Sequence, residues 1–137
     1  MGTINSNDLD ANCAFEHFFG KSHSEAVALF QTNALFYQED LQSMPAAALN
    51  FYAPALIEYL TSHRAKGDSD GASSFLHTVV WMFKTQRHII APETQTLLLA
   101  AADQISIAQT FYGAAPGIYG AFSDVNAEIK QHAESRA

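Results

Sequence analysis

Hydrophobic residues along this chain recur mostly at intervals of three or four positions, which is the spacing of one face of an α-helix. Three long segments follow this spacing, at residues 45–63, 72–87 and 92–112. The segment 72–87 is apolar over more than half of its helical circumference, which predicts a central, largely buried helix. No segment alternates convincingly between apolar and polar positions, as a half-buried β-strand would. The pattern therefore predicts an all-α bundle of about five or six helices.

Helix boundaries are marked by residues that satisfy the free amides of a first turn. Ser22 and Glu25 have the spacing of a capping box, in which each side chain accepts from the other residue's amide. Pro45 suits the first turn of the next long helix, because a proline there loses no useful amide. Pro54 falls inside that same helix and should kink its axis. Ser123 is the expected cap of a last helix that runs to about residue 134.

The size and composition fit a single domain. The chain has 137 residues, 48% of them hydrophobic, which is enough to form a core without metals or disulfides. Residues 1–11 are polar and predict a flexible N-terminal arm, so the predicted helical domain spans residues 12–137. The single cysteine, Cys13, excludes an intrachain disulfide. Neither a signal peptide nor a membrane-spanning run of about 18 apolar residues is evident, so we expect a cytoplasmic location.

The charge balance narrows the range of partners. Seven basic residues are scattered among fourteen acidic ones, for a formal net charge of −7. Nucleic-acid binding needs clustered lysines and arginines, so we expect no nucleic-acid partner. An acidic surface would instead steer a basic protein partner toward the molecule.

The usual metal, phosphate and catalytic motifs are not found in the sequence. A di-metal site in a helical bundle needs Glu-x-x-His motifs, and none occurs. Asp68 and Asp70 resemble the start of a calcium loop, but Val79 stands where that loop needs a glutamate. The chain also lacks a glycine-rich phosphate loop and a nucleophile-elbow serine. We therefore expect no metal and no cofactor.

Tyr37, Glu39 and Asp40 are the most specific candidates for a binding site. Glu39 and Asp40 are adjacent, so in a helix their side chains point about 100° apart. One carboxylate could then line a cleft or cap the next helix while the other meets water, and Tyr37 could hydrogen-bond across the groove. The group is either a structural junction between two helices or an acidic, aromatic patch for a partner.

A second candidate site combines residues near the predicted kink at Pro54. Tyr52, Glu58 and His77 could supply the polar groups of a pocket for a small ligand or a substrate. His77 lies on the less apolar side of its helix, and a partly buried structural histidine is the simpler interpretation.

Part of the chain resembles a known family. Residues 18–60 contain four characteristic runs: Phe19-Gly20-Lys21, Phe36-Tyr37-Gln38-Glu39-Asp40, Met44-Pro45 and Phe51-Tyr52-Ala53-Pro54-Ala55. These runs resemble an uncharacterised bacterial family of small all-α proteins with a Tyr-x-Glu-Asp, Met-Pro and Phe-Tyr-x-Pro-Ala pattern. The resemblance implies a bacterial origin and brings no catalytic residues. Small acidic proteins of this kind are compared with immunity proteins of bacterial toxin systems.

Three functions follow from these observations. The leading hypothesis is a non-enzymatic, acidic protein-binding domain, of which an immunity-like protein is one version. The first alternative is a small-ligand sensor or an enzyme with a pocket near the kinked helix. The second is a structural homodimer that buries Phe111, Tyr112 and Tyr119 across a two-fold axis.

Overall fold

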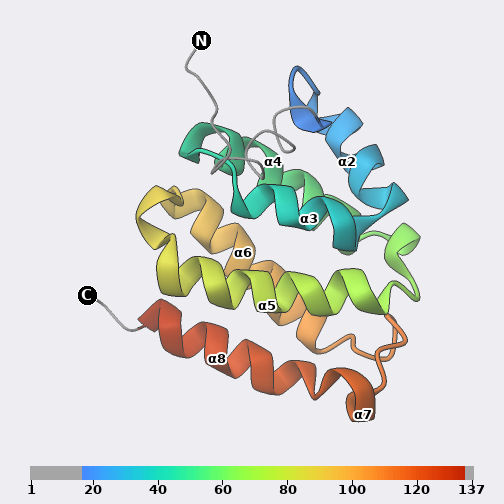
Figure 1. Ribbon diagram of the computed structural model, residues 1–137. Helices are drawn as coiled ribbons and strands as arrows, with labels where there is room; N and C mark the ends of the chain where they lie inside the picture. Colours follow the sequence, from blue (N-terminus) through green and yellow to red (C-terminus); the bar gives the residue numbers. More distant parts are fainter. Residues whose placement is uncertain (1–16, 135–137) are drawn as a thin grey trace.

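The computed structural model describes residues 17–134 of the chain (Figure 1). Within this range the backbone forms seven α-helices and two short 3₁₀ turns, and no residue is in a β-strand. The prediction of an all-α bundle is therefore confirmed. The predicted arm at residues 1–11 and Cys13 lie outside the described residues.

Helix α2 is His23–Thr32, α3 is Ala34–Gln42 and α4 is Ala46–Leu60, and α2 and α4 begin next to the predicted signals at Ser22 and Pro45. The capping box is confirmed, because the amide of Glu25 donates to Ser22 Oγ at 3.1 Å and the amide of Ser22 donates to Glu25 Oε1 at 2.8 Å. Asn33 alone separates α2 from α3, and its side chain accepts from the amide of Phe36. A single capping residue thus turns the chain between two helices.

Helix α4 contains Pro54, as predicted, although the kink itself stays a prediction. One turn earlier, the Asn50 side chain joins α4 to the connection between α5 and α6. Its Nδ2 donates to the carbonyl oxygens of Ala46 and Ile89, both at 2.8 Å, and its Oδ1 accepts from the amide of Ala91 at 2.8 Å. One side chain therefore satisfies two backbone groups of this connection, the carbonyl of Ile89 and the amide of Ala91, that no regular helix ladder reaches.

The second half of the chain comprises a turn η2 (His63–Ala65), α5 (Ser69–Thr85), a turn η3 (Arg87–Ile89), α6 (Pro92–Ser106), α7 (Pro116–Tyr119) and α8 (Phe122–Glu134). Helix α5 starts earlier than the predicted residue 72, because Asp68 accepts from the amide of Gly71 and caps it. Helix α6 ends at Ser106 rather than near residue 112, and residues 107–113 form turns instead.

Ser123 does not cap the last helix, because α8 already begins at Phe122. The amide of Phe122 donates to Gln109 Oε1 at 2.9 Å, so a side chain from the preceding loop replaces the predicted serine cap. The Nε2 of Gln109 also lies 2.8 Å from the carbonyl oxygen of Ala114 and 2.9 Å from that of Gly120. Gln109 thus organises the loop that leads into α8.

Helix α5 is central, as predicted. It packs against α3, α6 and α8, and Figure 1 shows it between α3 and α8, with α6 behind it. Helix α2 packs mainly on α4 and also contacts α3. The buried side chains of all these helices form one core, to which α5 contributes Ala72, Phe75, Leu76, Val79, Met82 and Phe83. None of the helices within residues 17–134 combines the length and the apolar character needed to cross a bilayer.

Candidate functional site

A cleft of about 390 Å³ opens on the outer side of α3, and we call it the α3 cleft. Its walls come from α3, from the residue that follows it, from α5 and from the segment just before α2. The lining residues are His17, Leu35, Phe36, Glu39, Asp40, Gln42, Ser43 and Ser74. The cleft therefore includes two of the three residues that the sequence predicted for this region.

The periodicity of α3 explains how the cleft acquires its walls. Ala34, Gln38 and Leu41 are buried at helical spacing and form the face that packs inward. Gln38 Nε2 donates to the carbonyl oxygen of Gly71 at 2.9 Å and holds α3 against the first turn of α5. The opposite face must then look outward, and it carries Leu35 and Phe36, with 44% and 49% of their surface exposed, together with exposed Glu39.

Asp40 forms the floor of the cleft and pairs with His17. The His17 Nδ1 lies 2.6 Å from Asp40 Oδ2, and the two side chains are 30% and 9% exposed, respectively. An ionised carboxylate can only accept a hydrogen bond, so this contact places a proton on Nδ1. Phe36 and Tyr37 pack against the same imidazole, with ring centroids 5.7 and 5.2 Å away. The buried carboxylate thus fixes the orientation of a partly exposed histidine.

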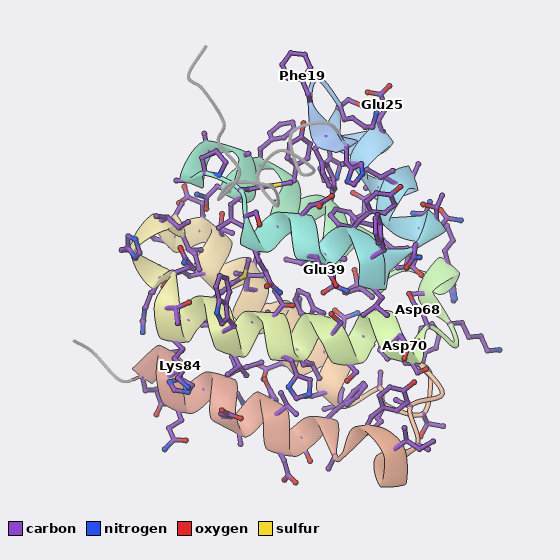
Figure 2. All side chains as sticks on the ribbon, viewed as in Figure 1. Phe19, Glu25, Glu39, Asp68, Asp70 and Lys84 are labelled. Atoms are coloured by element: carbon purple, nitrogen blue, oxygen red, sulfur yellow. The ribbon has the colours of Figure 1, made fainter. Side chains whose placement is uncertain are left out.

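The predicted divergence of Glu39 and Asp40 is confirmed, because Asp40 is buried and Glu39 is exposed. Figure 2 shows Glu39 on α3, away from the N-terminal turn that carries Phe19. Tyr37 makes ring contacts with His17, Phe18 and Phe36 instead of the predicted hydrogen bond across the groove. Its ring therefore supports the cleft from behind rather than crossing it.

The structure does not bring Tyr52, Glu58 and His77 together, so the prediction that they line one pocket is wrong. Tyr52 is buried, and its hydroxyl lies 2.8 and 2.9 Å from the carbonyl oxygens of Phe18 and Lys21. Glu58 is exposed and lies 2.7 Å from the Nε2 of His23 on α2. His77 is exposed on α5, not partly buried as expected. Each side chain serves a different surface because α4 presents Tyr52 and Glu58 on different faces.

Two of the three aromatic residues proposed for a dimer interface, Tyr112 and Tyr119, make hydrogen bonds within the chain. Tyr112 is 2% exposed and its hydroxyl donates to the carbonyl oxygen of Leu60 at the end of α4. Burial, followed by the charge of Asp68, raises the pKa of Tyr112 to about 12. The Tyr119 hydroxyl lies 2.7 Å from Asp70 Oδ1 and 2.9 Å from Ser69 Oγ. Tyr112 therefore holds the loop after α6 against the end of α4, and Tyr119 links α7 to the start of α5.

Asp68 and Asp70 lie at the start of α5, at the opposite end from Lys84, as Figure 2 shows. Both carboxylates already accept intramolecular hydrogen bonds, because Asp68 accepts from Tyr59 at 2.8 Å and Asp70 accepts from Tyr119. Burial and then the Asp68 hydrogen bond raise the pKa of Tyr59. No group of three or more potential metal-ligating side chains occurs within residues 17–134. Asp68 therefore caps α5 and anchors Tyr59, and Asp70 anchors Tyr119.

A second cleft of about 630 Å³ lies between α6 and α8. Lys130 Nζ lies 3.0 Å from Asp103 Oδ1, and Asn126 Nδ2 donates to the same oxygen at 2.8 Å. The Asn126 hydrogen bond, followed by that of Lys130, lowers the pKa of Asp103. The charges of Asp103 and Lys130 in this cleft are paired with each other, and their main role is to join α6 to α8.

Sequence reasoning missed several walls of the α3 cleft, above all His17, Leu35 and Phe36. The exposure of Leu35 and Phe36 could have been predicted, because the two residues lie outside the buried face of their helix. His17 left none, since it reaches Asp40 only through the chain reversal at Gly20, whose φ is +72°.

Comparisons with known proteins identify no relative of this chain. No protein-family model, no curated protein and no solved structure matches the chain. The resemblance of residues 18–60 to an uncharacterised bacterial family therefore stays a prediction.

Proposed function

We propose that the protein is an acidic protein-binding domain whose α3 cleft receives a basic segment of another protein. The observation that carries the proposal is the outward face of α3. Leu35 and Phe36 expose 44% and 49% of their surface beside the exposed carboxylate of Glu39. Large half-exposed apolar side chains next to a concave surface are typical of interaction sites.

The charge of the whole chain supports a basic partner. A net charge of −7 raises the local concentration of cationic proteins and accelerates their association at low salt. An immunity-like protein of a bacterial toxin system, acting in the cytoplasm, is the version of this function that we favour.

The first test is affinity capture from the lysate of the source cell, with the wild type, Glu39→Lys and Phe36→Ser as baits. Glu39 is exposed and Phe36 is half exposed, so both variants should keep the circular dichroism spectrum of the wild type, and only Phe36→Ser, which loses ring contacts with His17 and Tyr37, should melt at a somewhat lower temperature. Glu93→Lys is the matched control, because Glu93 is an exposed glutamate on α6, outside the α3 cleft. We expect a basic protein bound by the wild type and by the control but lost from both α3 variants.

The purified pair then allows a salt test. Electrostatic steering predicts that the association rate constant falls between low and physiological salt, while the dissociation rate constant changes little. Capture of the same proteins by all four baits, or an association rate insensitive to salt, would contradict the proposal. Light scattering of the bait alone detects the alternative in which a second copy of the chain covers the α3 face.

A second candidate, a small-ligand sensor or an enzyme, is favoured by the His17–Asp40 pair. A carboxylate that orients a histidine inside a cleft is the arrangement of many general bases. A thermal-shift screen with a panel of small metabolites tests it. A ligand that stabilises the wild type but not His17→Gln supports this function, whereas equal shifts for both proteins contradict it.

A further inference from the structure

We infer that the α3 cleft is built to take an arginine side chain of the partner protein. This inference rests on the proposed function and names the chemical group that the cleft recognises. It follows from the polar groups that line the cleft, from the exposed aromatic ring at its rim and from the state of its histidine.

The polar groups of the cleft are mainly hydrogen-bond acceptors. Glu39 contributes an exposed carboxylate. Gln42 directs its amide nitrogen to Thr78 Oγ1 at 3.4 Å, which leaves its carbonyl oxygen as the group able to meet a ligand. Ser43 and Ser74 add hydroxyls that can accept or donate. None of the residues that line the cleft is a lysine or an arginine, so an entering cation meets a positive side chain there only when His17 is protonated.

His17 adds another acceptor when its imidazole is neutral. Its Nδ1 is held by Asp40 Oδ2 at 2.6 Å and carries the proton of that hydrogen bond. In the neutral imidazole, Nε2 is then the unprotonated nitrogen and presents a lone pair. Asp40 itself is buried and paired with His17, so Glu39 is the carboxylate that a ligand can approach from water.

The apolar rim favours arginine over lysine. A guanidinium group stacks on aromatic faces, and the ring of Phe36 is half exposed at the rim. Leu35 can cover the aliphatic stem of the same side chain. Five N–H donors in a fixed plane match several dispersed acceptors, whereas a lysine ammonium concentrates three donors at one point.

The other acidic places in the described chain are less suited to this role. Asp103 already has the Lys130 ammonium at 3.0 Å, and Asp68 and Asp70 already accept from tyrosine hydroxyls. Asp70 is also exposed next to an aromatic side chain, but its Oδ1 already accepts from the Tyr119 hydroxyl, whereas exposed Glu39 lines the α3 cleft together with Phe36.

The test is a titration with N-acetyl-arginine amide at constant ionic strength, followed by two-dimensional ¹H–¹⁵N NMR. N-acetyl-lysine amide and the neutral isostere N-acetyl-citrulline amide are the comparison probes. We expect the arginine compound to shift the backbone amides of Phe36, Glu39 and Gln42 with a millimolar dissociation constant. The lysine compound should bind more weakly and the citrulline compound should not saturate.

Matched variants assign the effect to the cleft. Glu39→Gln should weaken binding of the arginine compound about fivefold, the loss of one exposed charged pair. Glu93→Gln, with the same charge change on α6, should leave binding unchanged. Equal binding of arginine and citrulline compounds, or shifts centred on Asp68 and Asp70, would overturn the inference.

The outcome also separates this inference from the proposed function. If the arginine compound leaves the spectrum unchanged while Phe36→Ser still abolishes capture of a partner, the arginine pocket is wrong and the protein-binding function stands. If both experiments fail, the proposed function is wrong as well.

Discussion

Replacing Tyr112 by phenylalanine tests the packing of the loop after α6 against the end of α4. The Tyr112 side chain is 2% exposed, and its hydroxyl donates to the carbonyl oxygen of Leu60. Leu60 is the last residue of α4, so its carbonyl is one of those that no later amide of the helix satisfies. The variant keeps the ring and removes only this hydrogen bond. At neutral pH we expect a loss of about 1–2 kcal/mol in the free energy of unfolding.

The pH dependence of this loss gives a sharper test. The folded pKa of Tyr112 is raised to about 12, above the unfolded value of about 10, because burial disfavours the phenolate. A raised folded pKa contributes stability that is fully present below about pH 10 and is lost as the pH rises toward about 12. Two pKa units correspond to about 3 kcal/mol for this one side chain. The wild type should therefore lose its advantage over Tyr112→Phe as the pH increases.

The assay is urea unfolding followed by far-ultraviolet circular dichroism at several pH values between neutrality and about pH 11. Tyr59 also has a raised pKa, so both proteins lose stability in alkali; the difference between them reports mainly on Tyr112, whose charge is the last of the causes that raise the pKa of Tyr59. Tyr37→Phe is the control, since the contacts of Tyr37 among the described residues are ring contacts. A difference between wild type and Tyr112→Phe that stays constant across this range would refute the reasoning.

Three further substitutions test the side chains that join separate elements. Asn50→Ala removes two hydrogen bonds between α4 and the connection before α6, and one within α4, and should cost about 2–4 kcal/mol in urea unfolding; retention of full stability would contradict the assigned role. Gln109→Ala should cost about 1–3 kcal/mol and accelerate amide hydrogen exchange in residues 114–122, whereas exchange that rises equally in α4 would indicate a global effect. Ser22→Ala removes the cap of α2 and should lower stability by about 1 kcal/mol. In a Glu25→Ala background, which removes the reciprocal acceptor, the loss from Ser22→Ala should be smaller, and an additive result would argue against the capping box.

The sequence predicted the helices well where the cause of a boundary is local. The Ser22–Glu25 box and Pro45 both act within one turn of the helix they start, and both helices begin next to them. Boundaries set by distant groups were wrong. Gln109 supplies the cap that Ser123 was expected to provide, and the turns after Ser106 are held by Tyr112 reaching Leu60. Such contacts depend on how the helices pack, which residue spacing does not encode.

The same distinction explains the candidate site. Glu39 and Asp40 could be assigned different environments from helical geometry alone, and the structure confirms it. The partner of Asp40 could not be predicted, because His17 lies 23 residues away and beyond a chain reversal. Grouping Tyr52, Glu58 and His77 required a packing of α4 against α5 that the fold does not provide, since α5 packs on α3, α6 and α8.

The way α3 is anchored bears on how the cleft would bind. Gln38 ties its inner face to Gly71 at the start of α5, and Gln42 reaches Thr78 further along the same helix. These contacts span more than a turn of each helix, so α3 cannot rotate to bury Leu35 and Phe36 without breaking them. The exposed face is therefore held in place by the inner face, and little conformational entropy remains to be lost when a partner docks. Gln38→Ala should consequently weaken partner binding even though Gln38 is buried and cannot touch the partner, and unchanged affinity in a folded variant would show that the anchoring is irrelevant to recognition.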